Sequence, residues 1–223
     1  MIQGFGTREI TDQILRAFVK SANGIMHEKQ KVVGQYEQTV WPTFEKMNTP
    51  VAVWGCLRGT EAVIDEAGQN EQDWYFFDHA YVMNESKHGV NPKLKDRVYR
   101  VTKNAQLINE IDDLSFADYE RIEKYKKHVQ LEPYKKNGKY ILVFEPSDFA
   151  KRWWEVPNWT EDTIQLLKNS TDLEIRIRKK NSLVSFESEV KGARAVVSLQ
   201  SAAAIQAEIW GIPGYCAEMS AAY

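Results

Sequence analysis

VAVWGCLRGTEAVIDEAGQNEQDWYFFDHAYV, residues 51–82, indicates the fold of this chain within a single stretch. It opens with a continuous apolar run, VAVWGCL, which is typical of a strand covered on both faces. The turn at Arg58, Gly59 and Thr60 leads into the helical segment TEAVIDEAGQN, and DWYFFDHAYV forms the next strand. Strand, helix and strand within about 30 residues predict a βαβ unit with parallel strands. Functional residues are therefore expected at the carboxyl ends of the strands.

Similar segments lie on both sides of this unit. Residues 7–23 have the apolar spacing of an amphipathic helix, whereas 24–49 are mixed and predict a short strand and a helix. RVYRVT (97–102) predicts another strand and 116–129 a charged helix. The segment LEPYKKNGK (131–139), with Pro, Gly and three Lys, is the expected boundary, which places one lobe at 1–134 and the other at 139–223.

The second half of the chain repeats the same alternation. Its expected segments are the strand YILVFEP (140–146), a Trp-rich loop, the helix TEDTIQLLKN (160–169), the strand LEIRIRK (173–179), a short connection, the strand ARAVVSL (193–199) and the helix AAAIQAEIW (202–210). The sequence therefore predicts an α/β protein of two small Rossmann-like lobes with parallel sheets.

Composition excludes several classes of protein. Of the 223 residues, 43% are hydrophobic and 27% charged, as in an ordinary globular protein, and the formal net charge of -2 gives no strong attraction to nucleic acid. The two cysteines lie in apolar runs, and the start of the chain lacks the apolar core of a signal peptide. No apolar run is long enough for a membrane span. We therefore expect a protein of the cytoplasm, or of the host cytoplasm if the chain is viral.

The best candidate site lies in ARAVVSLQSAAAIQAEIWGIPGYC, residues 193–216. Ser198, Gln200 and Ser201 stand where a buried strand opens into a helix, and Ser201 is a natural N-cap. A helix N-terminus attracts phosphate, and the small side chain of Ala202 lets a diphosphate approach the backbone. A capped helix in any α/β protein explains these residues equally well.

The segment SLQSAAAIQAEIWGIP (198–213) resembles the donor-site motif of glycosyltransferases of the GT-B fold, especially capsule-polysaccharide and sialyltransferase-like members. Ser201, Ala204, Ala207, Gly211 and Pro213 match the motif. The motif's acidic residue, which binds a ribose hydroxyl in the family, falls on Gln206, whose neutral amide is a weaker acceptor than a carboxylate.

The resemblance implies further donor-binding residues. It places a hydroxyl, here Ser147, at the end of the strand 140–146, and a basic residue on the strand that contains EIRIRKK. Arg176, Arg178 and Lys180 share one face of that strand, where they would neutralise the leaving diphosphate. An edge strand that uses charge to prevent pairing would show the same pattern.

The first lobe would then supply the acceptor side. Asp78 and His79 end a predicted strand, and either could take the proton of an acceptor hydroxyl, with Asp78 preferred. Arg58 is a candidate partner for a phosphate or for Asp78. A turn-capping Asp, a His bonded to the backbone and a solvated Arg are the structural alternatives.

The resemblance implies a compact GT-B-like enzyme that moves sugar from a nucleotide-sugar donor, with UDP-sugar favoured, to a hydroxyl on a saccharide, a small molecule or a hydroxymethylated DNA base, as phage enzymes of this fold do. The His and Cys residues lack metal-ligand spacing, so we expect no metal and no cofactor beyond the donor. The alternatives are a noncatalytic α/β module that binds a nucleotide or a protein partner, and an epimerase or phosphorylase on the same frame.

Overall fold

The computed structural model forms two units, residues 1–108 and 109–223, which we describe separately. The structure describes residues 1–6, 9–27, 30–32, 38–40, 49–56, 59–81, 99–106, 116–126, 129–218 and 220.

The N-terminal unit is built on a mixed sheet. Its elements are β1 (Gln3–Phe5), α1 (Glu9–Ser21), β2 (Ile25–His27), β3 (Gln30–Val32), β4 (Gln38–Val40), β5 (Val51–Trp54), α2 (Thr60–Gln69), β6 (Trp74–His79) and β7 (Tyr99–Lys103). The strand order of the sheet is β2-β1-β5-β6-β7, and β3 pairs with β4 in a separate antiparallel ribbon. The neighbours β2, β1, β5 and β6 run parallel, which confirms the βαβ unit, whereas β7 runs antiparallel to β6.

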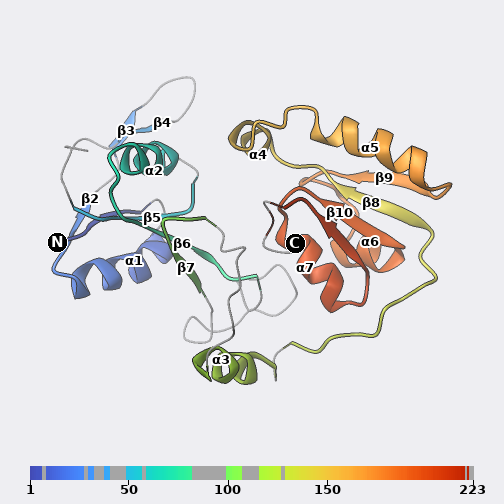
Figure 1. The fold of residues 1–223 in the computed structure, drawn as a ribbon, viewed down its shortest axis with the longest axis horizontal. Helices are drawn as coiled ribbons and strands as arrows, with labels where there is room; N and C mark the ends of the chain where they lie inside the picture. Colours follow the sequence, from blue (N-terminus) through green and yellow to red (C-terminus); the bar gives the residue numbers. More distant parts are fainter. Residues whose placement is uncertain are drawn as a thin grey trace. The chain divides into compact units, whose positions relative to one another are not determined.

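Helices cover both faces of this sheet, with α1 and α2 on opposite sides (Figure 1). The alternation of strand side chains explains why both faces are apolar. Val51 and Val53 belong to the core cluster that contains the buried side chains of α2, whereas Ala52 and Trp54 belong to the cluster of Leu15 and its neighbours on α1. A strand buried on both faces has no polar alternation, as its sequence indicates.

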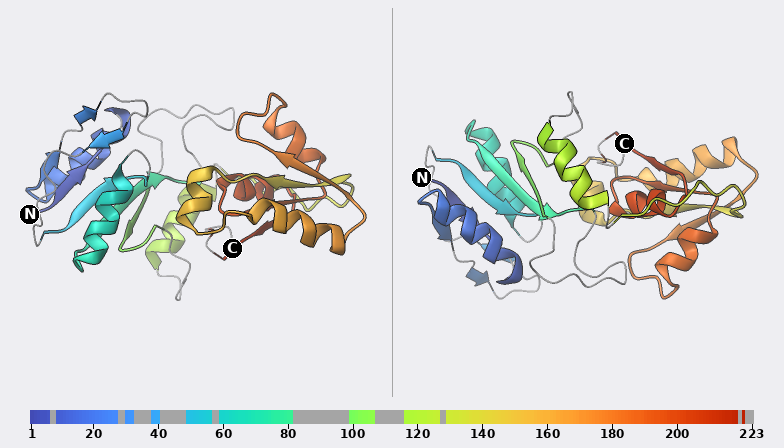
Figure 2. Two further views of the ribbon diagram at one scale, coloured as in Figure 1. Left: turned by 90° about the horizontal axis from the view of Figure 1, so that it is seen from above. Right: turned by 90° about the horizontal axis from the view of Figure 1, so that it is seen from below.

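The C-terminal unit has a parallel sheet throughout its described strands. Its elements are α3 (Phe116–Lys126), β8 (Tyr140–Phe144), α4 (Asp148–Trp153), α5 (Trp159–Ser170), β9 (Glu174–Arg178), α6 (Phe186–Gly192), β10 (Ala195–Ser198), α7 (Ala202–Ile209) and β11 (Gly214–Cys216). The strand order is β11-β10-β8-β9, with every neighbouring pair parallel. Figures 1 and 2 show α5 and α6 on opposite faces of this sheet.

The two sheets share one order of strands. We number the strands of each sheet by their order along the chain and leave out the β3–β4 ribbon. The N-terminal sheet then has the order 2-1-3-4-5, and the C-terminal sheet, read from β9 to β11, has the order 2-1-3-4. The C-terminal core packs β8 and β10 against α6 and α7, and its members include Tyr140, Leu142, Val190, Val196 and Ile212. The predicted α/β class with two Rossmann-like lobes is therefore confirmed.

Some local predictions differ from the structure. The Trp-rich loop contains the helix α4, and the short connection after β9 contains the helix α6. The predicted boundary segment 131–139 has no helix or strand, and its backbone is hydrogen-bonded to the C-terminal unit, with Glu132 N donating to Ile209 O at 2.9 Å and Lys135 N to Gly211 O at 2.8 Å. The division at 108/109 thus falls earlier in the chain than the boundary expected at 134–139.

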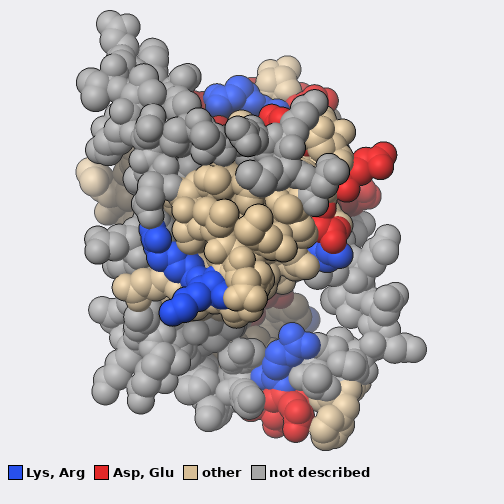
Figure 3. Space-filling view, turned by 90° about the vertical axis from the view of Figure 1, so that its left-hand side faces the viewer, with Lys and Arg blue, Asp and Glu red and all other residues tan. Residues whose placement is uncertain are grey.

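Neither sign of charge dominates the face of the molecule that Figure 3 shows. In the view of Figure 3, basic and acidic side chains border an area of uncharged residues, and neither sign forms a continuous field. Among the helices of the described ranges, none combines the length and apolar character needed to cross a bilayer.

Candidate nucleotide site and strand-end cluster

The carboxyl ends of β8 and β10 form a topological switch point in the C-terminal unit. The chain leaves β8 through α4 and α5 towards β9 on one side, and leaves β10 through α7 towards β11 on the other. In open α/β sheets, ligands bind where neighbouring strands diverge in this way. The segments that contain Ser147 and Ser201 follow these two strands directly, so the predicted donor residues on them come to one sheet edge.

The loop after β10 is held by serine hydroxyls. Ser198 is 1% exposed, and its Oγ accepts a hydrogen bond of 2.7 Å from the backbone N–H of Ser201. Ser201 is the N-cap of α7, as predicted, and its Oγ accepts from Ala203 N at 3.2 Å. Among the described residues, no hydrogen bond reaches the N–H of Ala202, the first residue of the helix. The helix therefore presents an unpaired donor and its positive end at the switch point.

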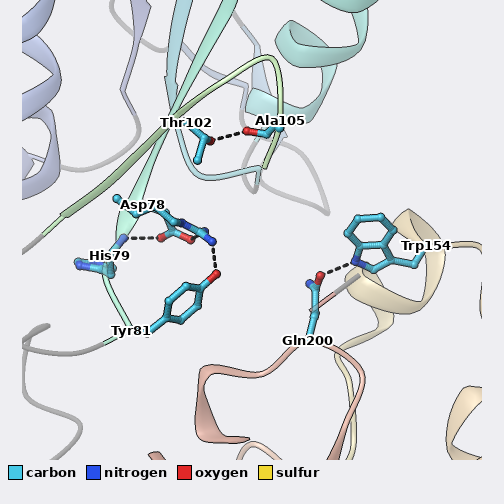
Figure 4. A network of polar contacts seen from close by, with 8 residues as sticks. Asp78, His79, Tyr81, Thr102, Ala105, Trp154 and Gln200 are labelled. Carbon is cyan, nitrogen blue, oxygen red and sulfur yellow. Dashed lines mark hydrogen bonds and ion pairs between the residues drawn. The ribbon is translucent and has the colours of Figure 1, made fainter. Parts of the chain in front are cut away.

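A second capped helix begins after β8. Ser147 is exposed and accepts a hydrogen bond of 3.2 Å from Ala150 N, which makes it the N-cap of α4. Trp154, at the other end of α4, donates its indole N–H to the side-chain oxygen of Gln200 (Figure 4). This bond joins α4 to the loop after β10, so the predicted residue Gln200 ties the two sides of the switch point together.

The predicted basic residues of β9 are paired with carboxylates. Arg176 and Arg178 lie on one face, as expected, because Arg176 stacks on the Tyr140 ring and Arg178 on the Phe186 ring of the same core. Arg176 forms an exposed ion pair of 2.8 Å with Glu174. Lys180 follows the end of β9 and is exposed.

The Arg178 side chain is 11% exposed, and its guanidinium contacts Glu189 of α6, whose side chain is 17% exposed. It also donates to Val184 O at 3.1 Å. Arg178 is therefore more fully occupied by contacts within the protein than Arg176 or Lys180.

Gln206 is buried, with 7% of its surface exposed, in the second turn of α7 beside Ala207. Sequence reasoning missed Glu145, the residue that follows β8 at the switch point. Its carboxylate lies 3.8 Å from Lys151 Nζ and 3.7 Å from Lys179 Nζ. A carboxylate directly after five apolar residues is the signal that could have indicated it.

In the N-terminal unit, Asp78 and His79 end β6 and point to opposite faces. Asp78 pairs across the sheet with Arg100, with 3.0 Å between Oδ2 and the guanidinium, and its Oδ1 accepts from His79 N at 2.7 Å (Figure 4). His79 lies edge-on to Trp54, with 5.3 Å between ring centroids. Arg58 lies outside the described residues.

We call Asp78, His79, Tyr81 and Arg100 the strand-end cluster; sequence reasoning also missed Arg100, which binds both Asp78 and Tyr81. Its guanidinium lies 5.6 Å from the centroid of the Phe76 ring and 4.9 Å from that of Tyr81, and it donates to the Tyr81 hydroxyl. Burial, assisted by the charge of Asp78, raises the pKa of Cys56 to about 11, so this thiol is protonated at neutral pH. Both candidate bases, Asp78 and His79, lie at this end of β6.

No protein-family model matches this chain, and a search of curated proteins finds no match. In the described residues, no group of three or more His, Cys, Asp or Glu side chains is arranged to hold a metal ion.

Proposed function

We propose that this protein is a glycosyltransferase that takes its sugar from a nucleotide-sugar donor, with UDP as the nucleotide. The observation that carries the proposal is the switch point of the C-terminal unit, where Ser198 and Ser201 order a helix N-terminus with an unpaired N–H at Ala202. Nucleotide diphosphates bind at such points because backbone donors and the helix dipole face their negative charge.

We assign donor binding to residues around the start of α7. The donor diphosphate lies at the start of α7, between the Ser201 loop and the Ser147 cap. Lys180, which follows the carboxyl end of β9, supplies positive charge on this side of the sheet, and Gln206 offers its amide to the ribose. Charge that develops on the leaving UDP is stabilised by these donors, which are in place before the reaction.

Asp78 of the N-terminal unit is proposed as the base for the acceptor hydroxyl. Arg100 fixes one of its oxygens at 3.0 Å, which holds the carboxylate in a single orientation. Atoms balance as in any glycosyl transfer: the bond from the anomeric carbon to the diphosphate breaks, a bond to the acceptor oxygen forms, and the acceptor proton passes to Asp78.

A noncatalytic nucleotide-binding module is the second candidate. Two observations favour it: Gln206 replaces the acid of the motif and is buried, and both oxygens of Asp78 already accept bonds. Such a module would bind UDP without releasing sugar.

The test is calorimetric titration of UDP into the wild-type protein and into Ser201→Gly. Glycine at an N-cap costs only a few tenths of a kcal/mol compared with serine, so the helix persists while the hydroxyl is lost. We expect UDP affinity to fall about tenfold or more, as the loss of one hydrogen bond to a charged group implies. Ser185→Gly is the matched control, because Ser185 caps α6 in the same unit by accepting from Ser188 N.

Equal UDP affinity in wild type and Ser201→Gly would refute the donor site. Release of free sugar from UDP-glucose, UDP-galactose and UDP-N-acetylglucosamine, measured on the same proteins, separates the transferase from the binding module. Asp78→Asn should abolish sugar transfer while retaining UDP binding.

A further inference from the structure

A groove opens at the amino edge of the C-terminal sheet, the edge opposite the switch point. It has a volume of about 420 Å³, and its lining comes from the starts of the strands and from the segment before β8. Ile141 lies at the start of β8, Ala195 begins β10, and Leu173 and Pro213 directly precede β9 and β11. We call this the amino-edge groove.

One wall of the groove is fixed by the segment 134–136. Lys135 N donates to Gly211 O at 2.8 Å, and the Tyr134 hydroxyl donates to Glu208 Oε2 at 2.7 Å. The latter bond also raises the pKa of Tyr134. Both anchors lie at the end of α7, so this wall is tied to the folded unit.

The charge of the lining is entirely positive, because Lys135, Lys136 and Arg194 line the groove and no Asp or Glu does. Lys135 is neutralised by Glu132, with 2.5 Å between Nζ and Oε2. Within the described part of the chain, the side chains of Lys136 and Arg194 form no ion pair or hydrogen bond. Two cations therefore remain available to an anion.

Two tyrosines add exposed aromatic surface. Tyr215 lies on the edge strand β11 and is 64% exposed, and Tyr134 is 66% exposed. An apolar floor, aromatic faces and unpaired cations together match a ligand that has both a ring and a phosphate. Proteins that bind single-stranded nucleic acid combine these elements, with bases stacked on aromatic side chains and phosphates held by Lys and Arg.

We propose that the amino-edge groove binds a nucleotide unit, with its base on Tyr215 and its phosphate between Lys136 and Arg194. The nucleotide unit comes from a single strand of nucleic acid or from a free nucleotide. This site is separate from the donor site, because it lies at the amino ends of the strands whose carboxyl ends form the switch point.

The experiment is fluorescence anisotropy with a fluorescein-labelled deoxythymidine dodecamer, and with unlabelled thymidine 5′-monophosphate as competitor. We expect Lys136→Ala with Arg194→Gln, and separately Tyr215→Ala, to weaken binding about fivefold or more. Tyr215→Phe keeps the ring and should bind as wild type does. With one phosphate neutralised, log K should fall with log salt with a slope of about -0.7.

Lys168→Ala is a control for the loss of surface charge: it removes one positive charge from exposed α5, outside the groove, whereas the double groove variant removes two. Circular dichroism spectra and thermal melts of every variant show whether it is folded. Competition by the mononucleotide at millimolar concentration assigns the groove to free nucleotides, and binding of the dodecamer alone assigns it to single strands.

Three results would overturn the proposal: no binding of either probe to the wild-type protein, equal weakening by Lys168→Ala, or unchanged binding in the folded groove variants. In the groove variants, the part of UDP binding that depends on Ser201 should match wild type. The groove variants should lose dodecamer binding and keep the Ser201-dependent UDP binding, and Ser201→Gly should do the opposite. Either proposal can therefore fail without the other.

Discussion

The ion pair between Arg178 and Glu189 is expected to support the C-terminal unit strongly. The two side chains are only 11% and 17% exposed, so removing one partner leaves the other charge largely without water. Breaking a fully buried pair costs about 3–5 kcal/mol, and the remaining exposure reduces this to about 2–3 kcal/mol for Glu189→Gln.

Arg178→Met should cost more than Glu189→Gln. It also removes the 3.1 Å bond to Val184 O and the stacking on Phe186 at 5.5 Å, each worth about 1 kcal/mol. We expect a loss of about 4–5 kcal/mol for Arg178→Met. In the double variant the two losses should overlap, with a coupling energy of about 1–2 kcal/mol.

Urea unfolding of the four proteins, followed by tryptophan fluorescence and circular dichroism, measures these energies. A coupling energy below about 0.5 kcal/mol would refute the view that the pair acts as a unit. UDP affinity of Glu189→Gln adds a functional readout: if Arg178 also contacts the donor phosphate, releasing it from Glu189 should tighten UDP binding, and unchanged affinity would assign Arg178 to the structure alone.

Three further perturbations test other parts of the structure. Asp78→Asn removes a charge that raises the pKa of Cys56 from its usual value to about 11, so iodoacetamide should alkylate Cys56 faster at pH 9 in this variant; an unchanged rate contradicts the assignment. Burial lowers the pKa of His27, so the folded state takes up a proton less readily than the unfolded state, and stability should fall as the pH drops from 7 through about 6.5 to 5. His27→Gln should show a smaller loss over this range in urea titrations, and an identical slope would remove His27 as a cause. Gly211→Ala should destabilise the C-terminal unit by about 2 kcal/mol or more, because φ is +72° and a Cβ would overlap the carbonyl oxygen of Pro133; a melting temperature equal to that of wild type would contradict the close approach.

The sequence predicts the buried central strands and the long helices of this fold because their cores impose strong patterns, whereas the β3–β4 ribbon lies in 24–49, where a short strand and a helix were expected. Val51–Trp54 and Tyr140–Phe144 are continuous apolar runs, and in the structure every residue of both is buried. The helix α6 was missed because it is short and buries only Val190. The capping residue Ser185 and the acidic residues after it indicate a helix start. In so short a helix, these local residues are better evidence than the spacing of apolar residues.

The candidate site was predictable in part. The N-cap role of Ser201 follows from sequence alone, because a serine at the junction of strand and helix has one dominant local use. The contacts of Gln200 with Trp154 and of Asp78 with Arg100 join residues 46 and 22 positions apart. No local pattern encodes such pairs, since they depend on how strands and helices pack. The strand order that creates the switch point is likewise a property of the whole sheet.

The close packing of Gly211 against Pro133 decides how the C-terminal unit can be isolated. A fragment that starts at residue 139 would lack the backbone bonds from Glu132 and Lys135 to the end of α7, and with them Tyr134 and Lys136. A fragment that starts at residue 129 keeps these backbone hydrogen bonds and both side chains. We expect the longer fragment to express as a folded protein and the shorter one to be degraded, because the ten residues 129–138, which contain no helix or strand, pack against the end of α7.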